Sequence, residues 1–156
     1  MARYTLEGTR FIFDTNFEGN PEKGMQGSTE RAGNIIIPKE MADELLGLGV
    51  NVKETKPREG DGDDFEPEYF VKVKLSFDSP WPPKINLRNL RGELVQLDDE
   101  NVVIIDDLVH DRAVSEVDIV FTTYRGKNSQ WTTLWIQNMY VIQDVGRDPF
   151  AAKYFG

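Results

Sequence analysis

The sequence predicts a mostly β-stranded chain that folds into a closed or nearly closed antiparallel barrel. Three observations support this fold class. Short segments throughout the chain alternate apolar and polar residues, which is typical of strands with one buried face. Turn residues separate these segments at short intervals, and only one segment has a clear helical period. A barrel suits such a chain because closure removes the exposed strand edges.

Residues 4–17 form the first predicted element, a strand or a pair of strands. Phe11 and Phe13 lie two residues apart, as on one face of a strand, and Gly8 marks a bulge. The following stretch, residues 18–33, contains Gly, Pro and scattered charges. It therefore predicts a flexible surface loop.

A buried strand and the clearest helix of the chain come next. Residues 34–37 are a short apolar run that predicts a fully buried strand. Pro38 suits the start of a helix, because its missing N–H group would have no partner in the first turn. Met41 and Leu45 then recur at helical spacing, so we expect a helix over about 38–48.

Three further strands carry outward basic residues. Residues 50–55 alternate, with Lys53 on the outer side. Residues 69–77 predict a strand whose outward residues are Phe70, Lys72 and Lys74. After a proline-rich turn, residues 84–88 predict a strand whose outward residues are Lys84, Asn86 and Arg88. Trp81 occupies the tip of the turn between these two strands.

The last third of the chain adds three strands and a second helix. Residues 93–97 predict a short strand. Asp98 can then cap a short helix over about 99–109. Residues 117–124 and 130–142 alternate on either side of a turn rich in Gly, Asn and Ser, which predicts a hairpin.

Trp131 and Trp135 lie four residues apart and therefore share one face of the last strand. Because that strand is apolar on both faces, it is typical of a central, buried strand, and we assign the pair mainly to the core. The alternative is that one of the two rings is an exposed stacking platform. Residues 146–156 form an aromatic-rich tail, which we expect to be flexible or to be an arm exchanged within a homodimer. In the absence of repeats or a linker, residues 1–156 predict a single domain.

Composition excludes several classes of function. The chain has no Cys, which excludes disulfides, thiolate catalysis and thiolate metal sites and fits a reducing cytoplasm. Its single His, His110, excludes a multi-histidine metal centre. No segment has the pattern of a signal peptide or the length of a membrane span. We expect a cytoplasmic, non-enzymatic chain that has no metal or other cofactor and does not contact membranes.

The net charge of −9 is unfavourable for binding nucleic acid, but the charges are segregated along the chain. Six acidic residues fall within residues 59–68, and nine within residues 93–118. Eight of the 18 basic residues fall within residues 53–91. The distribution of charge therefore matters more than its sum.

The outward basic residues of three successive strands indicate a surface for single-stranded DNA. Sequence-independent binding requires cations for the phosphates and aromatic rings on which the bases stack. The predicted binding residues are Lys53, Phe70, Lys72, Lys74, Trp81, Lys84, Arg88, Tyr124 and Arg125. They share one surface if their strands pair as neighbours, and the OB-fold is the commonest small barrel with such a binding face. The alternative is that each lysine is only solvated and discourages edge pairing.

The sequence leaves two other functions open. The acid-rich segment 93–118 could make the protein a DNA mimic or an interaction protein that acts on a host factor. Asp98, Asp106 and Asp107 could bind Mg²⁺ in a nuclease, since hard cations prefer carboxylate oxygens. Against that metal site, Asp98 lies where helix starts favour acids, and Asp106 and Asp107 are expected on the solvent side of the short helix.

Several segments, in order along most of the chain, resemble a known protein family. They are residues 34–41 (NIIIPKEM), 50–53 (VNVK), 56–59 (KPRE), 69–73 (YFVKV), 82–85 (PPKI), 139–141 (MYV) and 150–154 (FAAKY). The family that they resemble is that of bacteriophage OB-fold single-stranded DNA-binding proteins. The resemblance implies a protein that protects or organises exposed phage DNA during replication or recombination in the host cytoplasm. It also implies partners among replication or recombination proteins.

Overall fold

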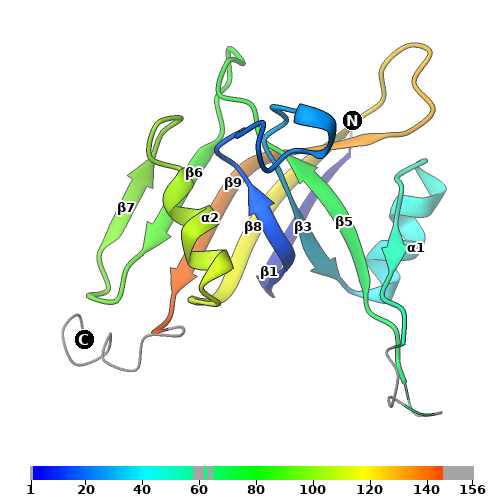
Figure 1. The fold of residues 1–156 in the computed structure, drawn as a ribbon. Coiled ribbons are helices and arrows are strands. Elements are labelled where there is room, and N and C mark those ends of the chain that lie inside the picture. The colour runs from blue at the N-terminus through cyan, green and yellow to red at the C-terminus, as the bar shows by residue number, and fades with distance from the viewer. Residues whose placement is uncertain (1, 58–61, 63–64, 146–156) are drawn as a thin grey trace.

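The computed structural model describes residues 2–57, 62 and 65–145 and consists mainly of strands (Figure 1). The strands are β1 (Arg3–Thr9), β2 (Phe11–Asn16), β3 (Ala32–Ile37), β4 (Lys53–Glu54), β5 (Tyr69–Lys74), β6 (Lys84–Arg88), β7 (Leu94–Leu97), β8 (Val114–Tyr124) and β9 (Thr133–Gln143). The helices are α1 (Lys39–Gly47), α2 (Val103–His110) and a short 3-10 helix, η1 (Met25–Gly27). The prediction of a mostly β chain is confirmed.

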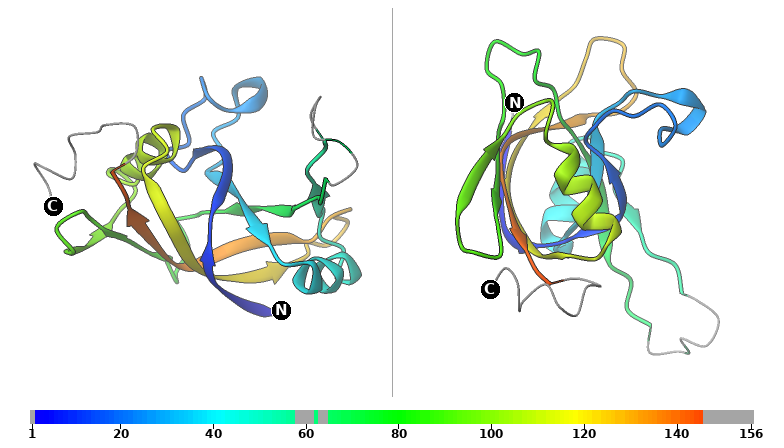
Figure 2. Two further views of the ribbon diagram at one scale, coloured as in Figure 1. Left: turned by 90° about the horizontal axis from the view of Figure 1, so that it is seen from below. Right: turned by 60° about the vertical axis from the view of Figure 1, so that its left-hand side comes forward.

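One continuous sheet runs through the strands in the order β1–β8–β9–β5–β3–β2. Its first and last members, β1 and β2, are successive segments joined by Arg10 alone, so the sheet curls until its two ends meet. The right-hand view of Figure 2 looks into the resulting ring of strands. The bent β1–β2 segment together with β3, β5, β8 and β9 gives the five-stranded barrel of an OB-fold, as predicted.

The pairing around β9 differs from the fully antiparallel sheet that we expected. β8 occupies one edge of β9 along its whole length. Both β5 and β6 run parallel to β9 along the other edge, where Lys74 is paired with Trp135 and Lys84 with Asn138. The condition that these strands pair as neighbours is therefore not met by β5 and β6, which each pair with β9. The loop between them is long enough for the chain to resume in the same direction instead of folding back as a hairpin.

The two helices lie at opposite ends of the barrel, with α2 across the near end in the right-hand view of Figure 2. α1 spans Lys39–Gly47, close to the predicted 38–48. α2 begins later than predicted because the residues before it form a turn. In that turn the Asp98 carboxylate accepts hydrogen bonds from the backbone N–H groups of Glu100 and Asn101.

Two bulges decide which side chains reach the outside of the barrel. The predicted bulge at Gly8, where φ is 66°, interrupts the pairing of β1 with β8. A second bulge, which we did not predict, inserts Gln137 into β9 opposite β8 and reverses the alternation there. The buried residues of β9 are consequently Leu134, Ile136, Met139 and Val141. Trp131 and Trp135 point outward, Trp131 being 47% exposed, so the prediction that they belong to the core is wrong.

The hydrophobic core fills the ring of strands. Its fully buried members come from most barrel strands and from both helices and include Ile35, Leu45, Val71, Val73, Ile105, Ile119, Phe121 and Met139. Neither helix in the described part of the chain has the length and apolar character that crossing a bilayer requires. The predicted tail, residues 146–156, lies outside the described residues.

Candidate nucleic-acid interface

Strand register gathers predicted binding residues from β4, β5 and β8 on the outside of the barrel. Directly paired residues of neighbouring strands place their side chains on the same side of a sheet. Phe70 is paired with Lys53, and Lys74 is paired with Trp135. The regular pairing of β8 with the first half of β9 puts Tyr124 on that side too. We call this surface the outer face; its members are Lys53, Phe70, Lys72, Lys74, Tyr124, Trp131 and Trp135.

An acidic side chain lies among these lysines. The carboxylate of Glu30, just before β3, contacts Nζ of Lys72 at 2.7 Å and Nζ of Lys74 at 2.9 Å. Lys74 Nζ also lies 5.9 Å from the ring centre of Trp135, within cation–π range. Burial raises the pKa of Glu30, but the hydrogen bonds and charges of the two lysines outweigh it and hold that pKa below its ordinary value. We call these four residues the lysine patch.

Phe70 points outward, as expected, but its ring is not accessible. Phe70 is only 7% exposed, because the ring of Phe13 covers it edge-on with the ring centres 5.4 Å apart. Phe13 itself is 62% exposed. Its φ of 65° is rare for a bulky residue and falls in the irregular part of the β2–β3 pairing. The exposed aromatic surface here is therefore that of Phe13, which corrects the predicted stacking role of Phe70.

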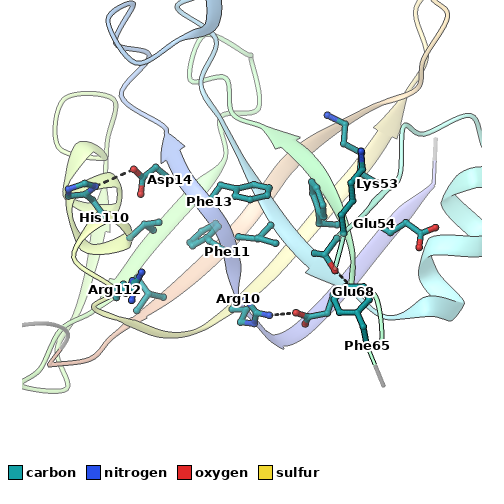
Figure 3. A pocket seen from close by; sticks show the side chains of 16 residues that line it. Arg10, Phe11, Phe13, Asp14, Lys53, Glu54, Phe65, Glu68, His110 and Arg112 are labelled. Carbon is teal, nitrogen blue, oxygen red and sulfur yellow. Dashed lines mark hydrogen bonds and ion pairs between the residues drawn. The ribbon is translucent and has the colours of Figure 1, made fainter. Parts of the chain in front are cut away.

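A groove of about 1340 Å³ opens beside this aromatic pair, between β2, the β4–β5 region and the C-terminal end of α2 (Figure 3). We call it the Phe13 groove; the lining residues used below are Arg10, Phe13, Lys53, Glu68, Phe70 and Arg112. Figure 3 shows Phe13 in its middle, with Lys53 toward one end and Arg112 toward the other. Because Lys53 and Phe70 also belong to the outer face, groove and face are continuous.

An ion pair and a histidine–carboxylate contact hold the rim of the groove. Arg10 donates a hydrogen bond to the carboxylate of Glu68, and both side chains are about half exposed. His110 Nδ1 lies 3.2 Å from the carboxylate of Asp14. His110 ends α2 at the surface, and its contact with Asp14 joins that helix to β2.

Lys84 and Arg88 lie on β6, beyond β5 along the same edge of β9, and both are exposed. Lys84 is paired with Asn138, which follows Trp135 and the Gln137 bulge. The structure therefore brings Lys84 close to the lysine patch through β9 instead of through β5. Arg88 is farther along the strand and does not join the patch.

Three loops project from the same side of the molecule, the upper side in Figure 1: the η1 loop, the β5–β6 loop and the β8–β9 hairpin. Trp81, in the second loop, is 84% exposed, and Tyr124, at the start of the hairpin, is 53% exposed. The Arg125 guanidinium folds back and donates hydrogen bonds to two carbonyl oxygens of its own hairpin. These three predicted residues surround one end of the outer face, and none of them lines the Phe13 groove.

Asp106 differs from its predicted position more than any other candidate. We expected it on the solvent side of α2, but it is 2% exposed. Its carboxylate accepts hydrogen bonds from Thr15 Oγ1 at 2.6 Å and from the backbone N–H groups of Phe17 at 2.8 Å and Glu18 at 2.9 Å. Burial raises the pKa of Asp106, although these hydrogen bonds favour the ionised form. The carboxylate considered as a metal ligand instead fastens α2 to the end of β2.

Sequence reasoning missed three residues of this surface: Phe13 as an exposed ring, Glu30 and Trp135. The position of Glu30 in the sequence could have indicated its role, because it lies two residues before β3, and β3 pairs with β5, which carries Lys72 and Lys74. The outward position of Trp135 depends on the Gln137 bulge, and the local sequence contains no glycine or other residue that would predict a bulge there. The position of Phe13 depends on an irregular pairing that alternation does not predict.

Comparison with protein families identifies the chain. A family model described as "Putative phage ssDNA-binding domain" matches residues 1–111, which is 111 of the 156 residues. The matched part contains β1 to β7 and α2, and with them Glu30, Lys72, Lys74 and most of the Phe13 groove. No curated protein matches the chain.

Several solved structures of bacteriophage proteins are similar to this chain. The C-terminally truncated single-stranded DNA-binding protein of bacteriophage Enc34 matches with a TM-score of 0.50 and 12% identity, over 91% of this chain and 86% of that chain. The Enc34 protein in complex with ssDNA matches with a TM-score of 0.50 and 11% identity, over the same shares. The gp2.5 single-stranded DNA binding protein of bacteriophage T7 has a TM-score of 0.45 and 11% identity, over 92% of each chain. The Enc34 matches show a shared fold, and on the family model the chain belongs to the family of phage single-stranded DNA-binding domains.

Proposed function

We propose that the outer face binds single-stranded DNA without reading its sequence, and that the protein thereby protects or organises phage DNA during replication or recombination. In this proposal Lys53, Lys72, Lys74, Lys84 and Arg88 contact phosphates, and the exposed rings of Trp81, Tyr124 and Trp131 and the half-buried ring of Trp135 stack on bases. Such a combination of cations and rings is what sequence-tolerant binding of single strands requires. The protein acts as a binder, not an enzyme, as a single domain in the host cytoplasm.

One observation carries this proposal: register and cation–π contact bring Lys72, Lys74 and Trp135 together on one side of the sheet. Lysines that serve only solubility need no exposed aromatic neighbours. Here the indole of Trp135 lies against a lysine, and Trp131 and Tyr124 continue the same side of β9 and β8. The proposed phosphate contacts and the proposed stacking surfaces therefore alternate along one path.

Titration with oligo-dT at several salt concentrations tests the proposal. Tryptophan fluorescence should be quenched, because three of the proposed stacking rings are indoles. Each phosphate contact with a single strand contributes about −0.7 to the slope of log K against log salt, so five cations predict a slope of about −3.5. Mixed-sequence strands should bind as oligo-dT does. Affinity that stays constant as salt is raised would contradict the proposal.

A charge-reversal pair locates the site. Lys72→Glu combined with Lys74→Glu should lower the affinity for oligo-dT by about 100-fold or more at low salt, since two attractions become repulsions. The matched control is Lys39→Glu combined with Arg91→Glu, which makes the same change of charge on α1 and on the β6–β7 turn. Equal losses in the two double variants would mean that net charge, and not this face, governs binding.

A further inference from the structure

We infer that the Phe13 groove is a second nucleotide subsite, which receives the same DNA strand beyond the lysine patch and holds one base against the Phe13 ring. The inference rests on the proposed function and extends it. DNA could bind at the lysine patch alone and leave the groove empty. The proposed function would then hold while the inference of a groove subsite failed. The ligand class is a nucleotide unit of single-stranded DNA, with its base in the groove and its phosphates toward the groove ends.

The aromatic part of the argument is the unusual position of Phe13. It is 62% exposed, whereas Phe70 beneath it is 7% exposed. The φ of 65° is costly for phenylalanine, and strained backbone of this kind concentrates at binding sites. A largely exposed ring that packs nearly perpendicular to a second ring provides a stacking platform for any base.

The charged part of the argument is the pair of cations at the ends of the groove. Among the described residues, neither Lys53 nor Arg112 makes an ion pair. Arg112 has a φ of 56° directly after α2, which ends the helix and leaves its side chain lining the groove. Glu54, the neighbour of Lys53 on β4, also lines the groove but makes no ion pair with Lys53. The groove thus has an aromatic centre with a cation toward each end.

The third part of the argument is continuity with the outer face. Lys72 and Phe70 are alternate residues of β5, about 7 Å apart along the strand, and share the outer side. A DNA strand that contacts Lys72 therefore has the Phe13–Phe70 ring pair directly beside it. Sites for free small molecules are usually concave and enclose most of the ligand. An open groove that continues a proposed DNA path instead favours a segment of the same strand.

The test compares a short and a long oligomer on one variant of the groove. Phe13→Asn removes the ring but keeps a residue that tolerates the left-handed φ, so the fold should be retained. With oligo-dT of about 12 nucleotides, within the site sizes known for OB-folds, we expect binding about tenfold weaker than wild type. With about 5 nucleotides, which the lysine patch alone accommodates, we expect no change. Leu94→Asn is the control, since Leu94 is 60% exposed on β7 and lies outside the groove.

A second variant tests the phosphate contact independently of the ring. Arg112→Gln should reduce the salt slope by about 0.7 for the longer oligomer only, and Arg91→Gln should leave it unchanged. Equal losses for both oligomers, or no loss for either, would overturn the inference while leaving the proposed function intact. A wild-type protein that binds neither oligomer would overturn the proposed function, and the inference with it.

Discussion

The lysine patch and the Phe13 groove lie on one continuous surface, but their cations are in different states. In the patch, Glu30 already bonds both Lys72 and Lys74, so an arriving phosphate must displace a carboxylate. In the groove, Lys53 and Arg112 make no ion pair with any described residue. The number of lysines on a surface therefore does not measure its attraction for DNA. The occupancy of those lysines in the free protein matters as well.

The ion pairs of the patch also organise it. Partly exposed ion pairs contribute only about 0.2–1 kcal/mol each to stability, so Glu30 does not lock the lysines permanently. It does hold both ammonium groups on the outer face, one of them against Trp135. The patch therefore combines preorganised cations with a built-in competitor, whereas in the groove only Arg10, at the rim, is paired with a carboxylate, that of Glu68. The following predictions separate these two modes.

The largest effect is expected from changing Asp106, because its hydrogen bonds hold the start of the segment between β2 and Glu30. Asp106 accepts hydrogen bonds from Phe17 and Glu18, at the start of that segment, and from Thr15. Asp106→Asn should lower the free energy of unfolding by about 2–3 kcal/mol, because an amide replaces one acceptor oxygen by a donor. Urea denaturation measures this loss. Asp107→Asn, on the exposed neighbour in α2, is the control and should have little effect.

The same variant has a predictable dependence on pH. Burial raises the pKa of Asp106, so the folded protein holds this proton more tightly than the unfolded chain does. The stability contributed by this group is complete below the unfolded pKa of about 4 and declines as pH rises through the folded pKa. The stability advantage of the wild type over Asp106→Asn should therefore shrink as pH rises from that point. An advantage that grows with pH would contradict the raised pKa.

Much of the fold could be predicted from the sequence. The difference between the paired lysines of the patch and the groove cations that make no ion pair with described residues could not. Alternation is a local property, and it correctly placed Lys72 and Lys74 outward on β5. The pairing of β6 with β9 and the bulge at Gln137 depend on strands far away in the chain, which the local alternation of residues cannot predict. Asp106 has the sequence context of a surface helix residue, and only the approach of β2 makes it a buried acceptor.

A smaller effect should follow from removing the competitor in the patch. Glu30→Gln should tighten binding of short and long oligomers by about three- to tenfold at low salt, because it releases ion pairs worth about 0.2–1 kcal/mol each. The gain should disappear at high salt. Glu68→Gln, which frees Arg10 in the groove, should tighten only the longer oligomer. Glu93→Gln is the control for net charge, and weaker binding by Glu30→Gln would mean that Glu30 only organises the lysines.

The smallest effect separates the two regions by fluorescence. The chain has three tryptophans, Trp81, Trp131 and Trp135, and none of them lines the Phe13 groove. Bases stacked near the lysine patch should therefore quench the tryptophan fluorescence, whereas a base stacked on Phe13 should not.

At saturation with the longer oligomer, Phe13→Asn should show the same quenching of tryptophan fluorescence as the wild type, despite its lower affinity. Trp135→Phe should lose part of the quenching and only about twofold in affinity, since phenylalanine keeps an aromatic ring on which a base can stack. If Phe13→Asn loses quenching instead, the two regions do not bind independently, because removing the ring in the groove has then moved DNA away from the patch.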